Sequence, residues 1–342
     1  MKNRKIIFLA VAAVVAILAV AGNSVWKKYY DKKVPNFSRT VEFYVYPGMT
    51  AGEVAGYVAD SCGARSSSSV RRAFESEAGN RVLPGHYTIM PSNTSVYVAR
   101  MVSHGWQTPV KLVLSGTMRL QSGLARKIGN QMMLDSADVI NALRDSALIA
   151  SFGFDRKDVF ALFIPDTYEI YWTESMKEVL TRQKAAYDAF WTDANKEKAR
   201  LQGLSMIEVS ILASIVNGET NYVPEMPAIA GVYLNRLRKG MLLQADPTVA
   251  YCFDYEPARI LKKHLEVDSP FNTYKHAGLP PAPICVPSKA ALEAVLNPDR
   301  HGYIYFCASP DFNGTHRFAV TLTEHLRNAR EFQRALNAIP RP

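Results

Sequence analysis

The feature that most constrains this chain is an apolar run near its N-terminus. Residues 6–22 read IIFLAVAAVVAILAVAG, without one charged side chain. This length is at the short end of what a helix needs to cross a hydrocarbon core of about 30 Å. Trp26, Tyr29 and Tyr30 follow it, as an aromatic belt at a membrane surface would. We expect an uncleaved single-pass membrane anchor.

The same run has a second interpretation. Ala19-Val20-Ala21 has the small-x-small form of a signal-peptide cleavage site. Both interpretations place the remaining chain across a membrane or on its surface. Charge does not decide the orientation, because four lysines after the run balance the three basic residues before it.

Composition and charge limit the kinds of partner and ligand that we expect. The 342 residues carry a net charge of +9, which suits an anionic partner or a basic solvated surface. No basic run is interleaved with aromatic residues, so we expect no nucleic-acid partner. Seven histidines lack the spacing of metal ligands, and we expect no metal and no cofactor. Four cysteines, without a C-x-x-C pair, are expected to be buried free thiols. These are Cys62, Cys252, Cys285 and Cys307.

An internal repeat follows a polar stretch. VYPGMTAGEVA (45–55) aligns with IMPSNTSVYVA (89–99) at an offset of 44 residues. Each copy predicts a short strand, a proline turn, a threonine N-cap and an amphipathic helix. The serine run between the copies suits a loop. Further along, the pattern predicts a strand at 110–114, one long helix over about 174–200, and a capping box at Ser205–Glu208.

The carboxylates are the candidates for chemistry, since no common nucleophile, metal or phosphate motif is present. In ILASIVNGET (211–220), Leu212, Ile215 and Glu219 lie on one helical face, so Glu219 continues an apolar stripe. A carboxyl group placed there would have a raised pKa, as a general acid needs. Gly218 would let a polymer approach the backbone. The alternative is that Glu219 lies solvated beyond a frayed helix end.

Four segments together resemble the YceG-like family of endolytic murein transglycosylases. They are SIVNGET (214–220), GVYLNRLRKGMLLQADPTVAY (231–251), SPFNTYKHAGLPPAPI (269–284), and YIYFCA (303–308) with the later His316. FIPDTYEIY (163–171) and the anchor with its LysM-like N-terminal repeat also fit the family's layout. The resemblance extends over nearly the whole chain and is highly specific in 214–284 and loose in 40–160. Relatives often carry an acid where this chain has Asn217.

The resemblance implies a reaction. Such enzymes cleave the β-1,4 bond between N-acetylmuramic acid and N-acetylglucosamine in nascent glycan strands and leave a 1,6-anhydro end. The family's catalytic glutamate corresponds to Glu219, which would act first as acid and then as base. It further implies substrate binding by a set of polar residues. These are Asn235, Arg236, Gln244, Asp246, Thr248, Asn272, Thr273, Tyr274, Asp166 and Tyr168.

The fold expected from the resemblance is α+β, with an N-terminal anchor, LysM-like β-α subdomains and a mixed α/β catalytic domain. The expected divisions are a cytoplasmic tail (1–4), the anchor (5–26), a linker (27–39), a LysM-like region (40–108), an intermediate α/β region (109–200) and a catalytic domain (201–342). The chain would sit in the inner (cytoplasmic) membrane with its catalytic domain on the periplasmic, outer side. Its expected partners are that membrane, peptidoglycan glycan strands and peptidoglycan synthases.

Two other functions stay open at this stage. A muramidase hydrolase would pair Glu219 with a second carboxylate, for which Asp246 is the candidate. A non-catalytic wall-binding scaffold would need neither. The chemistry of the product distinguishes these hypotheses.

Overall fold

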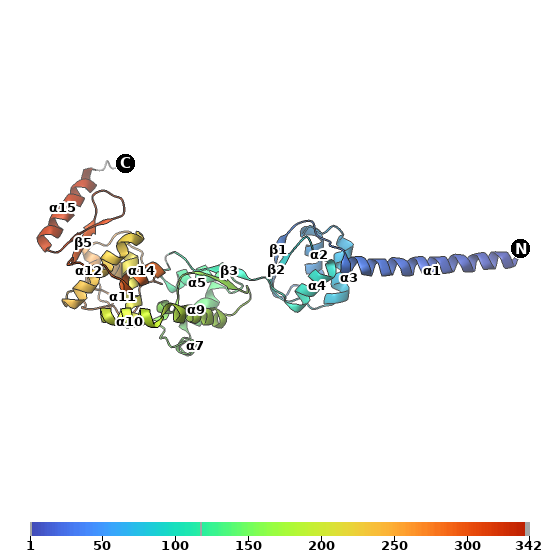
Figure 1. Cartoon of the computed structure of the whole chain (residues 1–342), viewed down its shortest axis with the longest axis horizontal. Coiled ribbons are helices and arrows are strands. Elements are labelled where there is room, and N and C mark those ends of the chain that lie inside the picture. Colours follow the sequence, from blue (N-terminus) through green and yellow to red (C-terminus); the bar gives the residue numbers. More distant parts are fainter. Residues whose placement is uncertain (1, 117, 339–342) are drawn as a thin grey trace. The chain divides into compact units, whose positions relative to one another are not determined.

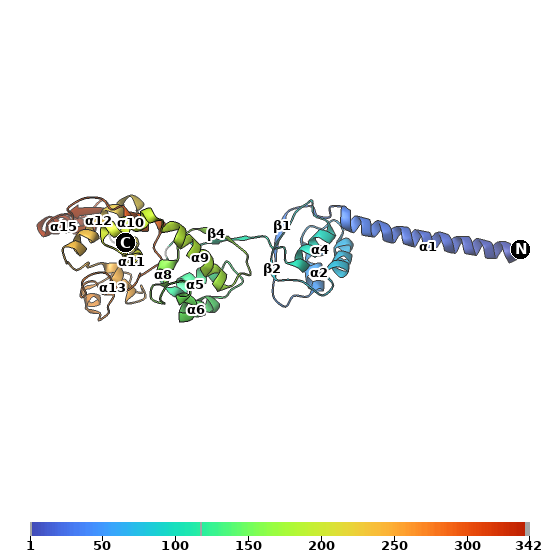
Figure 2. The same cartoon turned by 60° about the horizontal axis from the view of Figure 1, so that its bottom comes forward.

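A computed structural model describes residues 2–116 and 118–338, and the side chains of 2–5 lie outside this description. The chain divides into two compact units (Figures 1 and 2). Unit 1 contains the residues up to Val110 together with Glu169–Thr173, and unit 2 contains Lys111–Tyr168 and the chain from Glu174 onward. The chain passes between the units in β3 (Val110–Val113) and β4 (Thr167–Ile170), which form a two-stranded sheet.

The apolar N-terminal run lies in one long helix, α1 (Lys2–Lys33). Its part from Ile6 to Lys33 is apolar and long enough to cross a membrane, and none of it is buried within the protein over its most hydrophobic window. The helix therefore fits a single-pass anchor. It is the one such unbroken helix within the described residues.

The expected linker at 27–39 is not a free linker. Residues up to Lys33 continue α1, and its last turn is held by Asp31, which pairs with Arg72 at 2.7 Å. Asn36 and Phe37 are fully buried. The Asn36 amide donates to the Ser66 carbonyl and the Ser95 hydroxyl. These buried contacts are long-range, so the local polar composition did not reveal them.

The two copies of the repeat form the frame of unit 1. β1 (Val41–Val45) and β2 (Gly85–Ile89) pair antiparallel, and Thr50 and Thr94 cap α2 (Ala51–Ser61) and α4 (Ser95–His104) as predicted. The serine run was expected to be a loop, but Ser66 caps a helix there, α3 (Ser67–Ala73). α3 continues into the π-helical turn η1 (Phe74–Ala78), and both pack with α4 beside the strands (Figure 1).

Unit 2 is mainly helical. Its first part contains α5 (Gln121–Gly129), α6 (Ser136–Arg144), α7 (Ser146–Ala150) and α8 (Val159–Leu162). The single helix expected over 174–200 is two, α9 (Met176–Phe190) and α10 (Asp193–Gln202), because Thr192 caps a new helix after Trp191 leaves the helical conformation.

The second part of unit 2 is built around α11 (Met206–Glu219). It packs against α12 (Met226–Arg238) and α14 (Lys289–Leu296), which lie beside it in Figure 1. The remaining elements are η2 (Val223–Glu225), α13 (Asp246–Tyr251), η3 (Lys262–Glu266), the antiparallel pair β5 (Tyr305–Ala308) and β6 (His316–Ala319), and α15 (Leu322–Ala338). All four cysteines are free thiols, two of them buried.

Candidate active site

The central helix of unit 2 carries Glu219 at its last residue. Ser205 and Glu208 form the predicted capping box at its start, and Val209–Val216 are continuously buried. Leu212 and Ile215 are fully buried, as expected for the stripe that Glu219 continues. Thr220 is extended and ends the helix. Glu219 is thus held half-buried rather than on a frayed, solvated end.

The surroundings of Glu219 change its proton affinity. Burial, the largest cause, raises its pKa from 4.5 to about 7. The Tyr233 hydroxyl donates to Oε1 at 2.5 Å and lowers the pKa, while the charge of Asp246 raises it and that of Arg236 lowers it. Near neutral pH the carboxyl group is therefore divided between its two protonation states. That is the condition for a general acid.

Glu219 opens onto a cavity of about 360 Å³. This volume lies within the range of sites that bind small ligands. Its lining comes from seven separate segments of unit 2. The lining residues are Glu219, Tyr233, Arg236, Leu243, Gln244, Asp246, Tyr274, Phe306, Cys307, Ala308, His316 and His325. Four of the residues expected to bind substrate are therefore brought together with Glu219, namely Arg236, Gln244, Asp246 and Tyr274.

Asp246 is the second carboxylate of the cavity. It is exposed at the start of α13, and its Oδ1 accepts a hydrogen bond from the Tyr274 hydroxyl at 2.6 Å. Burial and the Asp246 carboxylate both raise the pKa of Tyr274, so the phenol keeps its proton. The pair presents a fixed hydroxyl and an acceptor oxygen to the cavity.

Arg236 reaches the cavity but donates most of its hydrogen bonds to backbone carbonyls. Its Nε donates to the Ile304 carbonyl at 2.6 Å, and one terminal nitrogen donates to the carbonyls of Leu242 and Leu243 at 3.1 and 2.8 Å. The same nitrogen lies 3.3 Å from the Gln244 side-chain oxygen. Gln244 has a positive φ of 52°, which these bonds help to hold.

Three of the residues expected to bind substrate lie behind the cavity wall. The hydroxyls of Thr248 and Thr273 are 2.8 Å apart, and Thr273 accepts from the Ala245 N–H at 3.0 Å. The Asn272 amide donates to the carbonyls of Leu265 and Val267, each at 2.8 Å. All three side chains are buried. Their polar atoms hold the loops that carry Gln244, Asp246 and Tyr274.

The three other residues expected to bind substrate lie outside the cavity. Asn235 donates to the carbonyls of His301 and Tyr303. Asp166 is exposed and pairs with Lys289, and the Tyr168 hydroxyl donates to the Ile164 carbonyl. The sequence did not reveal these positions, because neither the proline beside Asp166 nor the place of Asn235 late in a helix indicates where the side chain points.

Gly218 has a packing role that differs from the one expected. A Cβ atom built on it would lie 2.6 Å from the Pro247 Cβ, so the glycine lets α13 pack directly against α11. It does not open the backbone to a polymer. The neighbouring Asn217 accepts from the Ser288 N–H at 3.1 Å, at the start of α14.

Two residues of the site were not identified from the sequence as a pair. Glu225 looked like part of a proline-rich loop, and His316 entered only through the resemblance. Their side chains meet at 2.6 Å although they are 91 positions apart. Tyr233 could have been found, because it lies one helical turn before Arg236 on the same face of α12.

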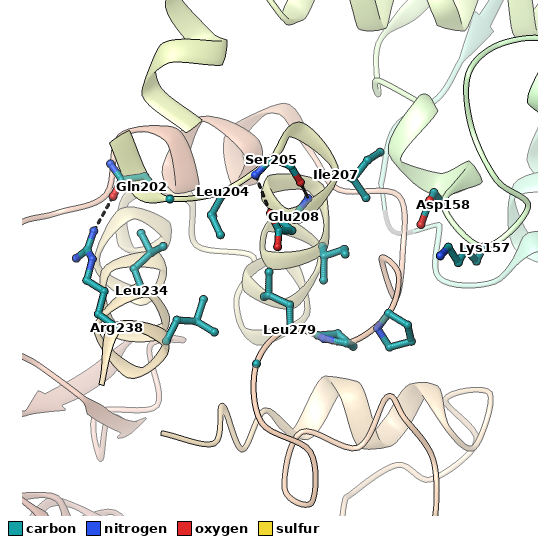
Figure 3. A pocket seen from close by; sticks show the side chains of 16 residues that line it. Lys157, Asp158, Gln202, Leu204, Ser205, Ile207, Glu208, Leu234, Arg238 and Leu279 are labelled. Atoms are coloured by element: carbon teal, nitrogen blue, oxygen red, sulfur yellow. Dashed lines mark hydrogen bonds between the residues drawn. The ribbon is translucent and has the colours of Figure 1, made fainter. Parts of the chain in front are cut away.

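A larger hollow of about 810 Å³ lies at the other end of α11 (Figure 3). Its walls include Leu204, Ile207 and Leu279, and the carboxylate of Glu208 is occupied by the capping box with Ser205. The cavity at Glu219 is the better candidate despite its smaller size. Several titratable side chains converge in it on an acid with a raised pKa.

Comparisons with known proteins agree with this fold. The YceG-like family matches over residues 43–331. Two curated proteins named endolytic murein transglycosylase are similar. The one from Bacillus subtilis (strain 168) is 35% identical over 47% of this chain and 44% of its own length. The one from Streptococcus pneumoniae (strain ATCC BAA-255 / R6) is 29% identical over 49% of this chain and 31% of its own.

A crystal structure of a yceG-like protein from Listeria monocytogenes superposes with a TM-score of 0.56 at 26% identity, covering 84% of this chain and 99% of that one. The class is therefore a mixed α/β protein with an N-terminal apolar helix and a cavity that contains Glu219. The chain belongs to the YceG-like family. It spans less than half the length of the curated relatives that it matches.

Proposed function

We propose that this protein is a membrane-anchored lytic transglycosylase. It cleaves the bond between N-acetylmuramic acid and N-acetylglucosamine within nascent glycan strands and leaves 1,6-anhydro ends, which terminates elongation. The observation that carries the proposal is Glu219 in its cavity, a half-buried acid whose pKa is raised to about 7. The names of the similar proteins support the class of substrate.

The reaction needs a proton donor at the glycosidic oxygen. Glu219 supplies the proton as the bond to the anomeric carbon breaks. The C6 hydroxyl of the same muramic residue attacks that carbon and loses its proton to a base in the cavity. An attack within one sugar unit has a high effective concentration, so no water has to be held and activated. Gln244, Asp246 and Tyr274 hold the sugar hydroxyls and acetamide groups at the cavity wall.

The remaining parts of the chain have supporting roles in this proposal. α1 anchors the protein in the inner membrane, with the catalytic unit on the outer side, where nascent strands are made. Unit 1 would be a LysM-like region that adds affinity for glycan. The order β1, α2, α3, η1 and β2, with antiparallel strands, supports this part of the proposal. Peptidoglycan synthases are the partners that would supply the strand.

The test is digestion of purified peptidoglycan by the full-length protein in detergent, followed by mass spectrometry. We expect products that end in 1,6-anhydro-N-acetylmuramic acid. Reducing ends without anhydro termini would instead support a hydrolase that uses Glu219 and Asp246 together. Asp246 is available for this because it lines the same cavity. Binding without cleavage, unchanged in Glu219→Gln, would support a scaffold.

A further inference from the structure

A histidine paired with a carboxylate lies at the same cavity. His316 begins β6 and lines the cavity, and Glu225 of η2 lies beside it. One carboxylate oxygen of Glu225 accepts the His316 backbone N–H at 2.8 Å, and the other lies 2.6 Å from the ring Nδ1. Both side chains are mostly buried, with exposed fractions of 14% for His316 and 10% for Glu225.

This contact determines how the imidazole is used. An ionised carboxylate only accepts hydrogen bonds, so Nδ1 carries a proton. In the neutral ring, Nε2 is then an acceptor. Within the residues that the structure describes, no side chain or backbone group hydrogen-bonds Nε2. The ring is also packed edge-to-face on Phe306, which fixes its orientation. A carboxylate that orients a histidine in this way prepares it as a base.

Glu219 and His316 occupy different parts of the wall. Glu219 ends α11 and His316 begins β6, and Tyr233 and Phe306 lie in contact between them with ring centroids 5.8 Å apart. The Tyr233 hydroxyl occupies Oε1 of Glu219. A proton to be donated therefore lies on Oε2, which would have to face the leaving oxygen first and the C6 hydroxyl afterwards if Glu219 did both tasks. Two groups on different parts of the wall remove that requirement.

We propose that His316 is a catalytic residue that accepts the proton of the C6 hydroxyl, with Glu225 as its positioning residue. This inference rests on the proposed transglycosylase function. The bond from the anomeric carbon to the leaving oxygen breaks and that oxygen takes the Glu219 proton. The bond from O6 to the anomeric carbon forms and the O6 proton passes to Nε2. His316 then loses one proton to solvent and Glu219 gains one, so both groups return to their starting states.

The proposal is tested with the full-length protein in detergent, on isolated glycan strands, by counting anhydro ends. His316→Ala should lower kcat by about 10²–10³-fold, as loss of a general base does, with little change in KM. Added imidazole should raise the kcat of His316→Ala by at least about tenfold and should not raise the kcat of Glu219→Gln. A purely structural histidine would not be rescued. His276→Ala, at an exposed position outside the cavity, is the control and should match the wild type.

Glu225→Gln separates positioning from packing, because it keeps the size of the side chain. Its amide oxygen can accept the His316 N–H, which leaves the amide NH₂ facing Nδ1. The ring proton must then move to Nε2, which can no longer accept one. We expect a loss of kcat similar to that of His316→Ala, without rescue by imidazole. A structural pair would tolerate this change.

The outcomes are distinct. If His316→Ala keeps kcat within about threefold of the wild type, or if Glu225→Gln does, His316 is not the base and Glu219 performs both steps. If His316→Ala does not fold, as circular dichroism would show, His316→Gln is measured in its place, and wild-type kcat in that variant would overturn the proposal. If the wild type itself yields no anhydro ends, the proposed function fails, whatever the variants do.

Discussion

Two sets of polar residues around the cavity look alike in the sequence and do different things in the structure. The wall set, Glu219, Asp246 and Tyr274, has polar atoms that face the cavity. The support set is made of Thr248, Asn272, Thr273 and most of the Arg236 guanidinium. The hydrogen bonds of the support set are made within the protein, to the loops around the cavity. The wall set should control turnover, and the support set should control stability.

The largest effect is expected at the wall. Glu219→Gln keeps the shape of the side chain but cannot donate the proton, and we expect at least about a 10³-fold loss of cleavage. Its pKa of about 7 in the fold is above the ordinary glutamate value of 4.5, so the folded state binds more protons between these values. Wild-type stability should therefore fall as pH rises through that range.

The melting temperature tests both halves of this prediction. Glu219→Gln should melt at a higher temperature than the wild type at pH 8 and at a similar temperature at pH 4. Measuring thermal unfolding and anhydro-end formation on one preparation provides the check. A variant that is inactive because it is unfolded would contradict the assignment of Glu219 to the wall.

The largest stability effect is expected in the support set. Arg236→Met would leave the Ile304, Leu242 and Leu243 carbonyls without this donor, and the side chain is only 7% exposed. We expect unfolding to become easier by about 3 kcal/mol or more. Arg238→Met is the matched control on the same helix, since Arg238 is exposed and bonds Gln202, and it should cost less than about 0.5 kcal/mol. Denaturant titration measures the free energy of unfolding of both variants. An equal loss in the two variants would argue against a support role for Arg236.

Gly218 tests whether close packing of two helices holds the site. Gly218→Ala would place a methyl group 2.6 Å from the Pro247 Cβ and push α13 away from α11. We expect a loss of about 1–3 kcal/mol in the free energy of unfolding. Gly123→Ala is the control, because Gly123 lies in α5 with nothing within 4 Å, and it should stabilise slightly. An unchanged Gly218→Ala protein would show that the two helices can separate without cost.

The sequence predicted features that depend on residues close together in the chain and missed those that depend on residues far apart. The caps at Thr50, Thr94 and Ser205 depend on a residue three positions away, and all three were predicted. The apolar face that ends at Glu219 is equally local. The sorting of polar residues into wall and support was not predictable. It depends on contacts such as Thr248 with Thr273, 25 positions apart, and Glu225 with His316.

A smaller effect is expected when the partner of Glu219 is removed. The Tyr233 hydrogen bond lowers the pKa of Glu219 against the larger effect of burial. In Tyr233→Phe the pKa should rise further, so Glu219 stays protonated to higher pH. The alkaline fall in cleavage should move up by about one pH unit, since a hydrogen bond to a charged group is worth about 1.5 kcal/mol. A shift to lower pH would show that the ionised form is not stabilised by Tyr233.

The smallest effect is expected at Asn217, where relatives often carry an acid. Residues two apart on a helix point in nearly opposite directions, so a carboxylate there faces away from Glu219. It would lie at the start of α14, where Asn217 already accepts the Ser288 N–H and where negative charge is favourable. Asn217→Glu should therefore leave cleavage within about twofold and stability within about 0.5 kcal/mol of the wild type. Asn217→Ala, which removes the acceptor, should cost about 1 kcal/mol. A tenfold change in cleavage by Asn217→Glu would mean that position 217 belongs to the wall, and that the catalytic unit works with two acids.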